Sequence, residues 1–224
     1  MGEPGYCGRL APSPTGLMHM GHARTFWSAW TRARNAGGKL VLRMDDLDRD
    51  RCRTAFAEAF VGDLRWLGMD WDEGPVSQAG RMALYEDAME RLKSGGWVYP
   101  CTCSRKDVMA ALAAPHEGED EPVYPGTCRR RVADATHGSS RVSWRMRVAW
   151  GGVVEFVDGR MGRRRFVGGE DFGDFVVWRP DGLPSYQLAC AVDDGLMGMT
   201  EVVRGEDLMA STARQLTVLR ALGW

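Results

Sequence analysis

The fold is decided by the segment Gly8-Arg-Leu-Ala-Pro-Ser-Pro-Thr-Gly-Leu-Met-His-Met-Gly-His22 near the start of the chain. A short apolar run from Tyr6 to Ala11 is followed by Pro12 and Pro14, which end it because proline lacks the N–H group that a strand ladder needs. From Met20 to Ala36 the residues mostly favour helix, until Gly37-Gly38 ends the pattern. The segment therefore predicts a strand, a tight loop and a helix.

The start of this expected helix is suited to bind phosphate. Its free N–H groups and the positive end of the helix dipole point outward. His19 and His22 are three residues apart, so their imidazoles share one face and can donate together to phosphate oxygens. Gly21 leaves room for a flat group to lie on the backbone. An isolated His-x-x-His pair would more simply be a cap and a surface residue, so the surrounding residues must decide.

Those surrounding residues form a longer motif. Pro-Ser-Pro-Thr-Gly followed by His-Met-Gly-His resembles the first signature of class I aminoacyl-tRNA synthetases, in the form used by the glutamate and glutamine enzymes. The resemblance implies an α/β fold with a Rossmann-like, doubly wound parallel sheet and an inserted small zinc-binding and β subdomain. It also implies that the segment holds ATP and stabilises the α-phosphate while an aminoacyl-adenylate forms, with His19 and His22 as catalytic residues. The implied ATP-binding residues are Ser13, Thr15, Gly16, His19, Gly21 and His22.

Composition limits the classes of partner and compartment. The 224 residues suffice for one large domain with an insert, and the net charge of −1 provides no overall attraction to nucleic acid. Any tRNA contact must therefore come from local basic patches. No apolar run approaches the roughly 18 residues of a membrane span, and no signal-peptide pattern opens the chain. We therefore expect a cytoplasmic protein with reduced thiols.

A second apolar run, Lys39 to Met44, predicts a strand that ends in the acidic segment Asp45 to Asp48. Ligands of open parallel sheets bind beyond the carboxyl ends of the strands, so this segment is expected to face the same crevice as the histidines. A solvated turn that caps the next helix is the simpler interpretation. The resemblance implies that Asp45 holds the substrate's α-amino group, where relatives usually have Glu. The side chain of Asp is one methylene shorter than that of Glu, so the carboxylate lies roughly 1.5 Å further from the substrate.

The whole chain is expected to divide into three parts. Residues 1–100 form the first half of the catalytic domain, with amphipathic helices at Thr54–Leu67 and Met82–Leu92 and a turn at 68–74. Residues 101–170 form the inserted subdomain, with small antiparallel strands predicted by alternation within 142–148 and 153–167. Residues 171–224 resume the catalytic domain, with a strand from Thr200 and a final helix at Thr212–Leu222.

Three of the six cysteines indicate a metal site. The thiolates of Cys101 and Cys103 cannot readily pair with each other, but both can reach one tetrahedral zinc, with Cys128 as a third ligand. In a reducing compartment such clusters more often bind metal than form disulfides. The alternative is three reduced cysteines without a metal. Candidates for the fourth ligand are Tyr124, His116 and His137, and on chemistry alone a histidine is the commoner partner.

The spacing Cys-x-Cys, Tyr-x-x-x-Cys resembles the zinc site of the glutamyl-Q tRNA(Asp) synthetases, a branch of the same family. The sequences of Thr200–Leu208 and Ser211–Gln215 also resemble those of this branch. The resemblance implies that Tyr124 is the fourth ligand of a structural Zn²⁺. It further implies that L-glutamate is activated by ATP, with Mg²⁺, to glutamyl-adenylate. The acceptor that it implies is queuosine, the modified wobble base of tRNA(Asp).

Arginine and carboxylate side chains suit the recognition of glutamate, because the arginine fork binds a carboxylate bidentately. The resemblance implies that the substrate is bound by Arg9, Leu10, Ala11, Pro12, Ser13, Asp45, Tyr186 and Arg204. Arg9 or Arg204 could instead pair with the acidic residues at 45–48 or 193–194. Arginine-rich segments at 129–131, 141–147 and 160–165 predict a surface that binds tRNA phosphates. We expect a monomer.

Two other functions remain open at this stage. Class I synthetases have a second, lysine-containing signature, and no lysine follows Lys106 here. We expect either a truncated sequence or a natural loss of that loop. The chain could thus be the catalytic portion of a glutamyl-tRNA synthetase that charges tRNA(Glu). It could also be an inactive tRNA- or nucleotide-binding module, which the missing lysines and the shorter Asp45 favour.

Overall fold

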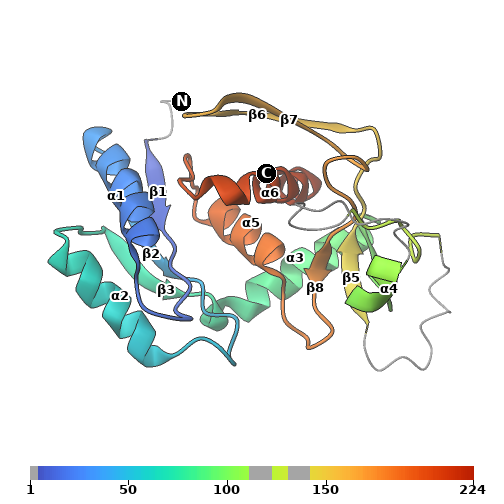
Figure 1. The fold of residues 1–224 in the computed structure, drawn as a ribbon, viewed down its shortest axis with the longest axis horizontal. Coiled ribbons are helices and arrows are strands. Elements are labelled where there is room, and N and C mark those ends of the chain that lie inside the picture. The colour runs from blue at the N-terminus through green and yellow to red at the C-terminus, as the bar shows by residue number, and fades with distance from the viewer. Residues whose placement is uncertain (1–4, 111–122, 131–141) are drawn as a thin grey trace. The chain divides into compact units, whose positions relative to one another are not determined.

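The computed structural model describes residues 5–110, 123–130 and 142–224 (Figure 1). The chain forms two compact units, which we describe separately. The first comprises residues up to 84 together with 193–206, and the second comprises 85–192 and 207–224. The expected division after residues 100 and 170 stays a prediction. Within the described ranges, no helix combines the length and apolar character needed to cross a membrane.

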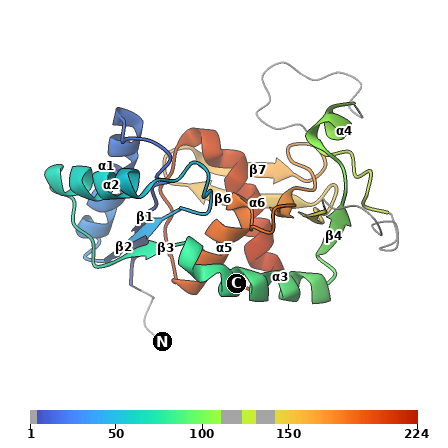
Figure 2. The same ribbon diagram turned by 90° about the horizontal axis from the view of Figure 1, so that it is seen from below.

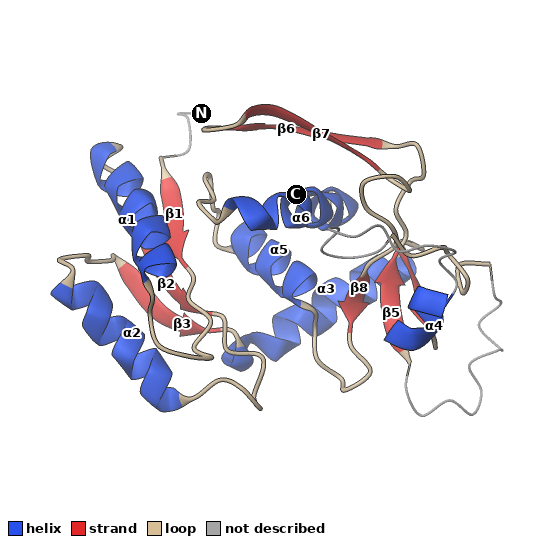
Figure 3. Cartoon of the chain, in the orientation of Figure 1, coloured by secondary structure: helices blue, strands red, loops and turns tan. Residues whose placement is uncertain are grey.

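The first unit is built on a parallel sheet in which strand β2 lies between β1 and β3. The strands are β1 (Cys7–Leu10), β2 (Lys39–Met44) and β3 (Glu73–Ser77), and the helices are α1 (Met20–Asn35) and α2 (Thr54–Trp66). Strands and helices alternate along the chain, as Figure 3 shows. Leu10 of β1 is in register with Leu42 of β2. The parallel sheet confirms the predicted α/β class.

Alternation along β2 gives the sheet two different faces. Leu40, Leu42 and Met44 are buried in one core with residues of α1 and α2, and both helices lie on the same side of the sheet (Figure 2). Because successive side chains of a strand point to opposite faces, Arg43 belongs to the other face. The described core residues of this unit are Leu10, Phe26, Ala29, Ala33, Leu40, Leu42, Met44, Phe60, Leu64 and Met69.

Strand β3 was not anticipated by the sequence pattern, which predicted only a turn over 68–74 before the helix from Met82. The strand has a single apolar residue that is partly buried, Val76, and it contains Pro75. It lies at the edge of the sheet and pairs only with β2 among the described strands. An exposed edge strand needs little apolar sequence, because backbone pairing alone defines it. The short helix η1 (Ala79–Arg81) follows directly.

The second unit contains antiparallel strands and most of the remaining helices. Strands β4 (Val98–Cys101), β5 (Ser143–Met146) and β8 (Val176–Trp178) form one sheet in that order, and β6 (Val153–Asp158) pairs with β7 (Gly162–Val167). The helices are α3 (Met82–Ser94), α4 (Arg105–Ala110), α5 (Tyr186–Leu196), η3 (Glu206–Leu208) and α6 (Met209–Ala221). The first three residues of α3, the last four of α5 and the first of η3 are counted with the first unit. The strands predicted within 142–148 and 153–167 are confirmed.

The strand predicted from Thr200 is wrong, since residues 200–205 form none. This segment lies beside β1, where the backbone N–H groups of Thr200 and Glu201 donate to Cys7 O. Further along, however, Val203 O accepts from the side chain of Arg9 at 3.1 Å instead of from a backbone amide. A guanidinium thus takes the place of the next rung of the ladder, so pairing stops.

Candidate active site and metal centre

The loop between β1 and α1 is fastened by its prolines. Pro12 and Pro14 are buried, whereas Ser13 and Thr15 between and after them are exposed. The carbonyl of Pro12 accepts from the N–H of Asp45 at 2.9 Å, which ties the loop to the end of β2. Similarly, the carbonyl of Pro14 accepts from the backbone before α2. The two hydroxyl side chains are therefore displayed outward from a fixed backbone.

His19 and His22 together cap helix α1. The Nδ1 atom of His19 accepts from the N–H of Gly21 at 3.1 Å, and Nδ1 of His22 accepts from the N–H of His19 at 3.5 Å. The two rings stack with centroids 3.7 Å apart. A Cβ atom at Gly21 would lie 2.9 Å from Cε1 of His19, so a larger residue there would require the His19 ring to move. The His19 imidazole lies beside Gly21 in this structure, and the role of Gly21 in binding a flat group stays a prediction.

The capping geometry fixes which nitrogen of each histidine can donate. Both rings accept through Nδ1, so in the neutral form the proton is on Nε2. His22 packs edge-on against Phe60, with ring centroids 5.6 Å apart. Burial, and secondly the neighbouring His19, lower the pKa of His22 below its ordinary value. At neutral pH His22 is therefore an uncharged hydrogen-bond donor at the start of a helix.

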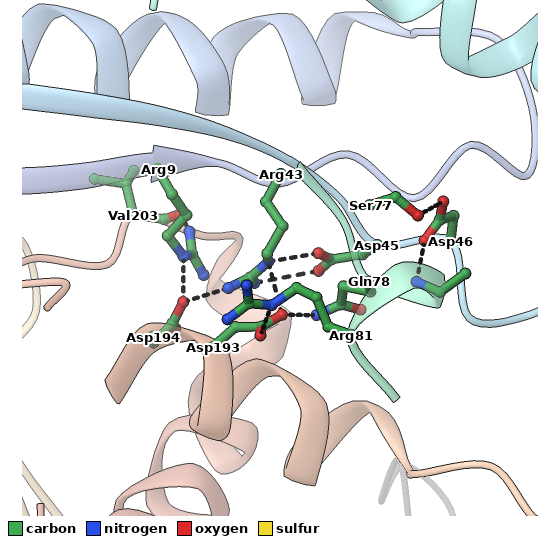
Figure 4. A network of polar contacts seen from close by, with 11 residues as sticks. Arg9, Arg43, Asp45, Asp46, Ser77, Gln78, Arg81, Asp193, Asp194 and Val203 are labelled. Atoms are coloured by element: carbon green, nitrogen blue, oxygen red, sulfur yellow. Dashed lines mark hydrogen bonds and ion pairs between the residues drawn. The ribbon is translucent and has the colours of Figure 1, made fainter. Parts of the chain in front are cut away.

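On the opposite face of the sheet, Arg43 is completely buried among carboxylates (Figure 4). Its Nε donates to Asp45 Oδ1 at 2.7 Å, and its Nη2 approaches Asp45 Oδ2 at 3.4 Å. Its Nη1 donates to Asp194 Oδ1 at 2.7 Å. The guanidinium also lies 3.8 Å from Asp193 Oδ2. The guanidinium of Arg43 therefore joins the end of β2 to Asp193 and Asp194, two residues of α5 that belong to the first unit.

Arg9 extends this buried network to β1. Its Nε is 3.3 Å from Asp194 Oδ1, so Asp194 accepts from two arginines. Burial opposes the ionisation of Asp194, but the charges of Arg9 and Arg43 outweigh it and lower the pKa of this carboxyl. Burial has the larger effect at Asp45 and raises its pKa, although Arg43 opposes the shift. The two carboxyls thus differ in how readily they lose a proton.

The network continues to the end of β3. Asp193 accepts from Gln78 at 2.8 Å and from Arg81 at 2.7 Å. Asp46 accepts from the hydroxyl of Ser77 and caps η1 through the N–H of Ala79. Arg9, Arg43 and Arg81 form ion pairs with Asp45, Asp193 and Asp194. This pairing offsets the cost of burying charged groups together.

Sequence reasoning identified some of these residues and missed others. The alternative pairing of Arg9 with the acidic pair at 193–194 is the one present. Arg204 lies near enough for its charge to lower the pKa of Asp194. Tyr186, at the start of α5, belongs to the second unit and is 39% exposed. Arg43 was missed, although an arginine inside an otherwise apolar strand is itself a signal of a buried ion pair.

The predicted metal ligands converge in the second unit. The sulfur atoms of Cys101, Cys103 and Cys128 all lie within 4.8 Å of one another. The hydroxyl of Tyr124 lies 3.5 Å from the sulfur of Cys101 and 3.4 Å from that of Cys103. A tetrahedral zinc with bonds of about 2.3 Å to sulfur and 2.0 Å to oxygen places such atoms about 3.5 Å apart. The four side chains therefore fit a zinc ion.

The backbone around the centre also suits a metal-bound phenol. The N–H of Cys128 donates to the hydroxyl oxygen of Tyr124 at 2.9 Å, a bond that favours negative charge on that oxygen. Cys101, Tyr124 and Cys128 are all buried, which shields a centre of this kind from solvent. His116 and His137, the other predicted candidates for a fourth ligand, lie outside the described residues.

Comparison with known proteins places the chain in a family. The model described as the catalytic domain of tRNA synthetases class I (E and Q) matches residues 7–224. The glutamyl-Q tRNA(Asp) synthetase of Symbiobacterium thermophilum is 48% identical, over 97% of this chain and 71% of that protein. The protein of the same name from Nitratidesulfovibrio vulgaris is 46% identical, over 96% of this chain and 70% of the relative.

A solved glutamate tRNA ligase from Elizabethkingia meningosepticum matches with a TM-score of 0.85 at 24% identity. The match covers 99% of this chain and 48% of that protein, so this chain spans about half its length. Together, the fold and the family match define the catalytic domain of a class I synthetase of the glutamate and glutamine group. Within that group, the chain belongs to the glutamyl-Q tRNA(Asp) synthetases.

Replacement of Arg43 by Met tests the buried network. Without the guanidinium, Asp45 and Asp194 lose their shared cation in a buried setting, so R43M should lower the free energy of unfolding by about 3–5 kcal/mol. R51M is the matched control, because Arg51 is 74% exposed and pairs with Asp48 at the surface. The control should change stability by less than about 0.5 kcal/mol in urea denaturation. Equal stability of R43M and wild type would contradict the argument.

The protonation of His22 can be followed by NMR titration, with its resonance assigned through its loss in H22Q. We expect a midpoint below the ordinary value of about 6.5. Because the folded-state pKa is the lower one, the unfolded chain takes up the proton first. The contribution of this group to stability is then lost as pH falls below about 6.5. A midpoint at or above the ordinary value would refute the assignment of a neutral donor.

Proposed function

We propose that this chain activates L-glutamate with ATP and transfers the glutamyl group to the queuosine base of tRNA(Asp). The observation that supports this most directly is the start of α1, where His19 and His22 accept backbone hydrogen bonds through Nδ1, so that Nε2 of each ring is the nitrogen that can donate to a ligand. Membership of the glutamyl-Q family supports the choice of amino acid and acceptor.

The residues at the helix start serve the ATP side of the reaction. We assign ATP binding to Ser13, Thr15, Gly16, His19, Gly21 and His22. The glutamate α-carboxylate attacks the α-phosphorus in line, a bond to the carboxylate oxygen forms, and the bond to pyrophosphate breaks. Hydrogen bonds from Nε2 of His19 and His22 stabilise the charge that develops on the α-phosphate oxygens. Mg²⁺, when bound, neutralises phosphate charge.

The glutamate side draws on the buried network. We assign contacts with the amino acid to Arg9, Leu10, Ala11, Pro12, Ser13, Asp45, Tyr186 and Arg204. Asp45 accepts from Arg43 through both carboxylate oxygens, and we propose that this carboxylate faces the substrate ammonium group. Arg9 already shares Asp194 with Arg43, so Asp194 stays paired when Arg9 turns to a substrate carboxylate.

The second unit supplies the metal centre and a basic surface. We assign a structural Zn²⁺ to Cys101, Cys103, Tyr124 and Cys128, because four protein ligands leave no position for chemistry. Arg163 and Arg165 on β7 are exposed, and Arg164 between them is partly buried. Arg163 and Arg165 are therefore the arginines we expect to contact tRNA phosphates. Arg145 does not join them: it is buried, contrary to the prediction from the segment 141–147. We further propose a cytoplasmic monomer.

Glutamate-dependent exchange between ATP and pyrophosphate tests the first step, with and without added tRNA. Wild-type protein should exchange, and H22N should reduce kcat about 10²–10³-fold through the loss of one donor to the transition state. S28A is the control on the same helix, because Ser28 is exposed and its hydroxyl donates to the carbonyl of Arg24 one turn earlier. It should exchange at the wild-type rate. No exchange by folded, zinc-loaded wild type would favour the inactive binding module instead.

The acceptor is tested separately, by labelled glutamate transfer to tRNA(Asp) with and without queuosine and to tRNA(Glu). Transfer confined to queuosine-containing tRNA(Asp) is the expected result. Charging of tRNA(Glu) would support the alternative, the catalytic portion of a glutamyl-tRNA synthetase.

The zinc ligands are tested by metal analysis and chelator competition. Wild type should bind one zinc per chain. Changes to residues that only support the ligands weaken metal binding by up to about 100-fold, so loss of a ligand in Y124F should weaken it by at least about 100-fold. A double variant, H116N with H137N, should bind as wild type does. If the double variant loses zinc and Y124F keeps it, a histidine is the fourth ligand and the assignment of Tyr124 is wrong.

A further inference from the structure

Arg145 is a buried cation that the glutamylation reaction does not use. It is 9% exposed and lies on β5, which pairs antiparallel with β4. In that register Arg145 is opposite Tyr99 and Ser143 is opposite Cys101. Side chains diagonal across an antiparallel pair share one face and come within reach of each other. The strand register therefore directs the arginine at the metal centre.

Two contacts join Arg145 to separate ligands of the centre. Its Nε donates to the sulfur of Cys101 at 3.3 Å. Its guanidinium carbon lies 3.9 Å from the centroid of the Tyr124 ring, which places the positive charge over the ring face. A bond from N–H to a metal-bound sulfur and a cation over a metal-bound phenol both stabilise negative charge.

The positive charge of Arg145 can act on the metal centre because the carboxylate of Asp174 forms its ion pair with Arg129. Asp174 is buried, and its carboxylate accepts from Arg129, Tyr99 and the N–H of Val148. Arg145 bonds instead to the main-chain carbonyl of Asp174, at 2.8 Å. That bond fixes the position of the guanidinium without pairing its charge.

The metal centre needs such a cation. Zinc with three thiolates and one phenolate has two excess negative charges, and burial makes an uncompensated charge costly. Arg147, the next arginine along the chain, lies over the ring of Tyr99 and donates to the carbonyl of Arg129. Arg129 pairs with Asp174. Of Arg129, Arg145 and Arg147, Arg145 is the one with contacts to Cys101 and Tyr124 in the described residues.

We infer that Arg145 stabilises the zinc-loaded centre, by its bond to the Cys101 sulfur and its charge over the Tyr124 ring. This role rests on the proposed zinc site and not on the glutamylation activity. It makes Arg145 a positioning residue for the metal ligands. Loss of the guanidinium should therefore weaken zinc binding while the zinc-free fold persists.

Zinc affinity of R145Q, measured by chelator competition, should be about 10–100-fold weaker than that of wild type. R147Q is the matched control, since it removes the same charge two residues away, and it should bind zinc within about twofold of wild type. R145K keeps the charge but cannot reproduce the fork, so its affinity should fall between those of R145Q and wild type. If R145Q does not fold, R145K decides, and wild-type affinity in R145K would overturn the inference.

Two further readouts separate this role from a general effect on folding. Thermal unfolding without zinc should be similar for R145K and wild type, and added zinc should raise Tm less in the variant. In cobalt-substituted protein, loss of the N–H bond to sulfur should shift the sulfur-to-metal charge-transfer band to lower energy. An unshifted band overturns the inference. So does absence of zinc binding by wild type, which would refute the zinc site itself while exchange and transfer could still support the proposed function.

Discussion

The burial of one arginine governs the arrangement of the first unit. Arg43 occupies the face of β2 opposite the apolar core, where water cannot solvate it. A buried guanidinium must be paired, so Asp45 at the end of β2 and Asp194 of α5 are held at hydrogen-bond distance from it, with Asp193 slightly further away. Arg9 and Arg81 then complete the pairing of those aspartates. Parallel strands and a helix end, distant in sequence, are thereby joined at one point.

The second unit solves a similar problem with the opposite charge. Its central buried group is the carboxylate of Asp174, which accepts from an arginine, a tyrosine and a backbone amide. Around it, the strands β4 and β5 present cysteine and arginine on a common face. In both units a buried ion sets the local geometry, and apolar packing fills the space around it.

The sequence predicted the fold wherever apolar spacing was regular. β2 was predicted with its observed bounds, and α1 and α2 to within a residue. β3 was missed because an exposed edge strand with a proline has little apolar pattern. The strand expected from Thr200 was wrong because a side chain, not a backbone amide, takes the carbonyl of Val203. Tertiary contacts of this kind leave no local signature.

For the site, short motifs predicted which residues gather but not how they are paired. The cysteines and Tyr124 converge as their spacing and resemblance suggested. The partners of Arg145 depend on strand register, which a sequence without known pairings does not specify.

The prolines of the first loop have a thermodynamic consequence. Ring closure fixes φ at both positions, and burial of Pro12 and Pro14 holds the backbone between them. A nucleotide bound at the site that we propose would meet groups that are already ordered, so little conformational entropy would be lost on association. A more flexible loop with the same hydroxyls would lose more entropy on binding and would hold the nucleotide less tightly at that proposed site.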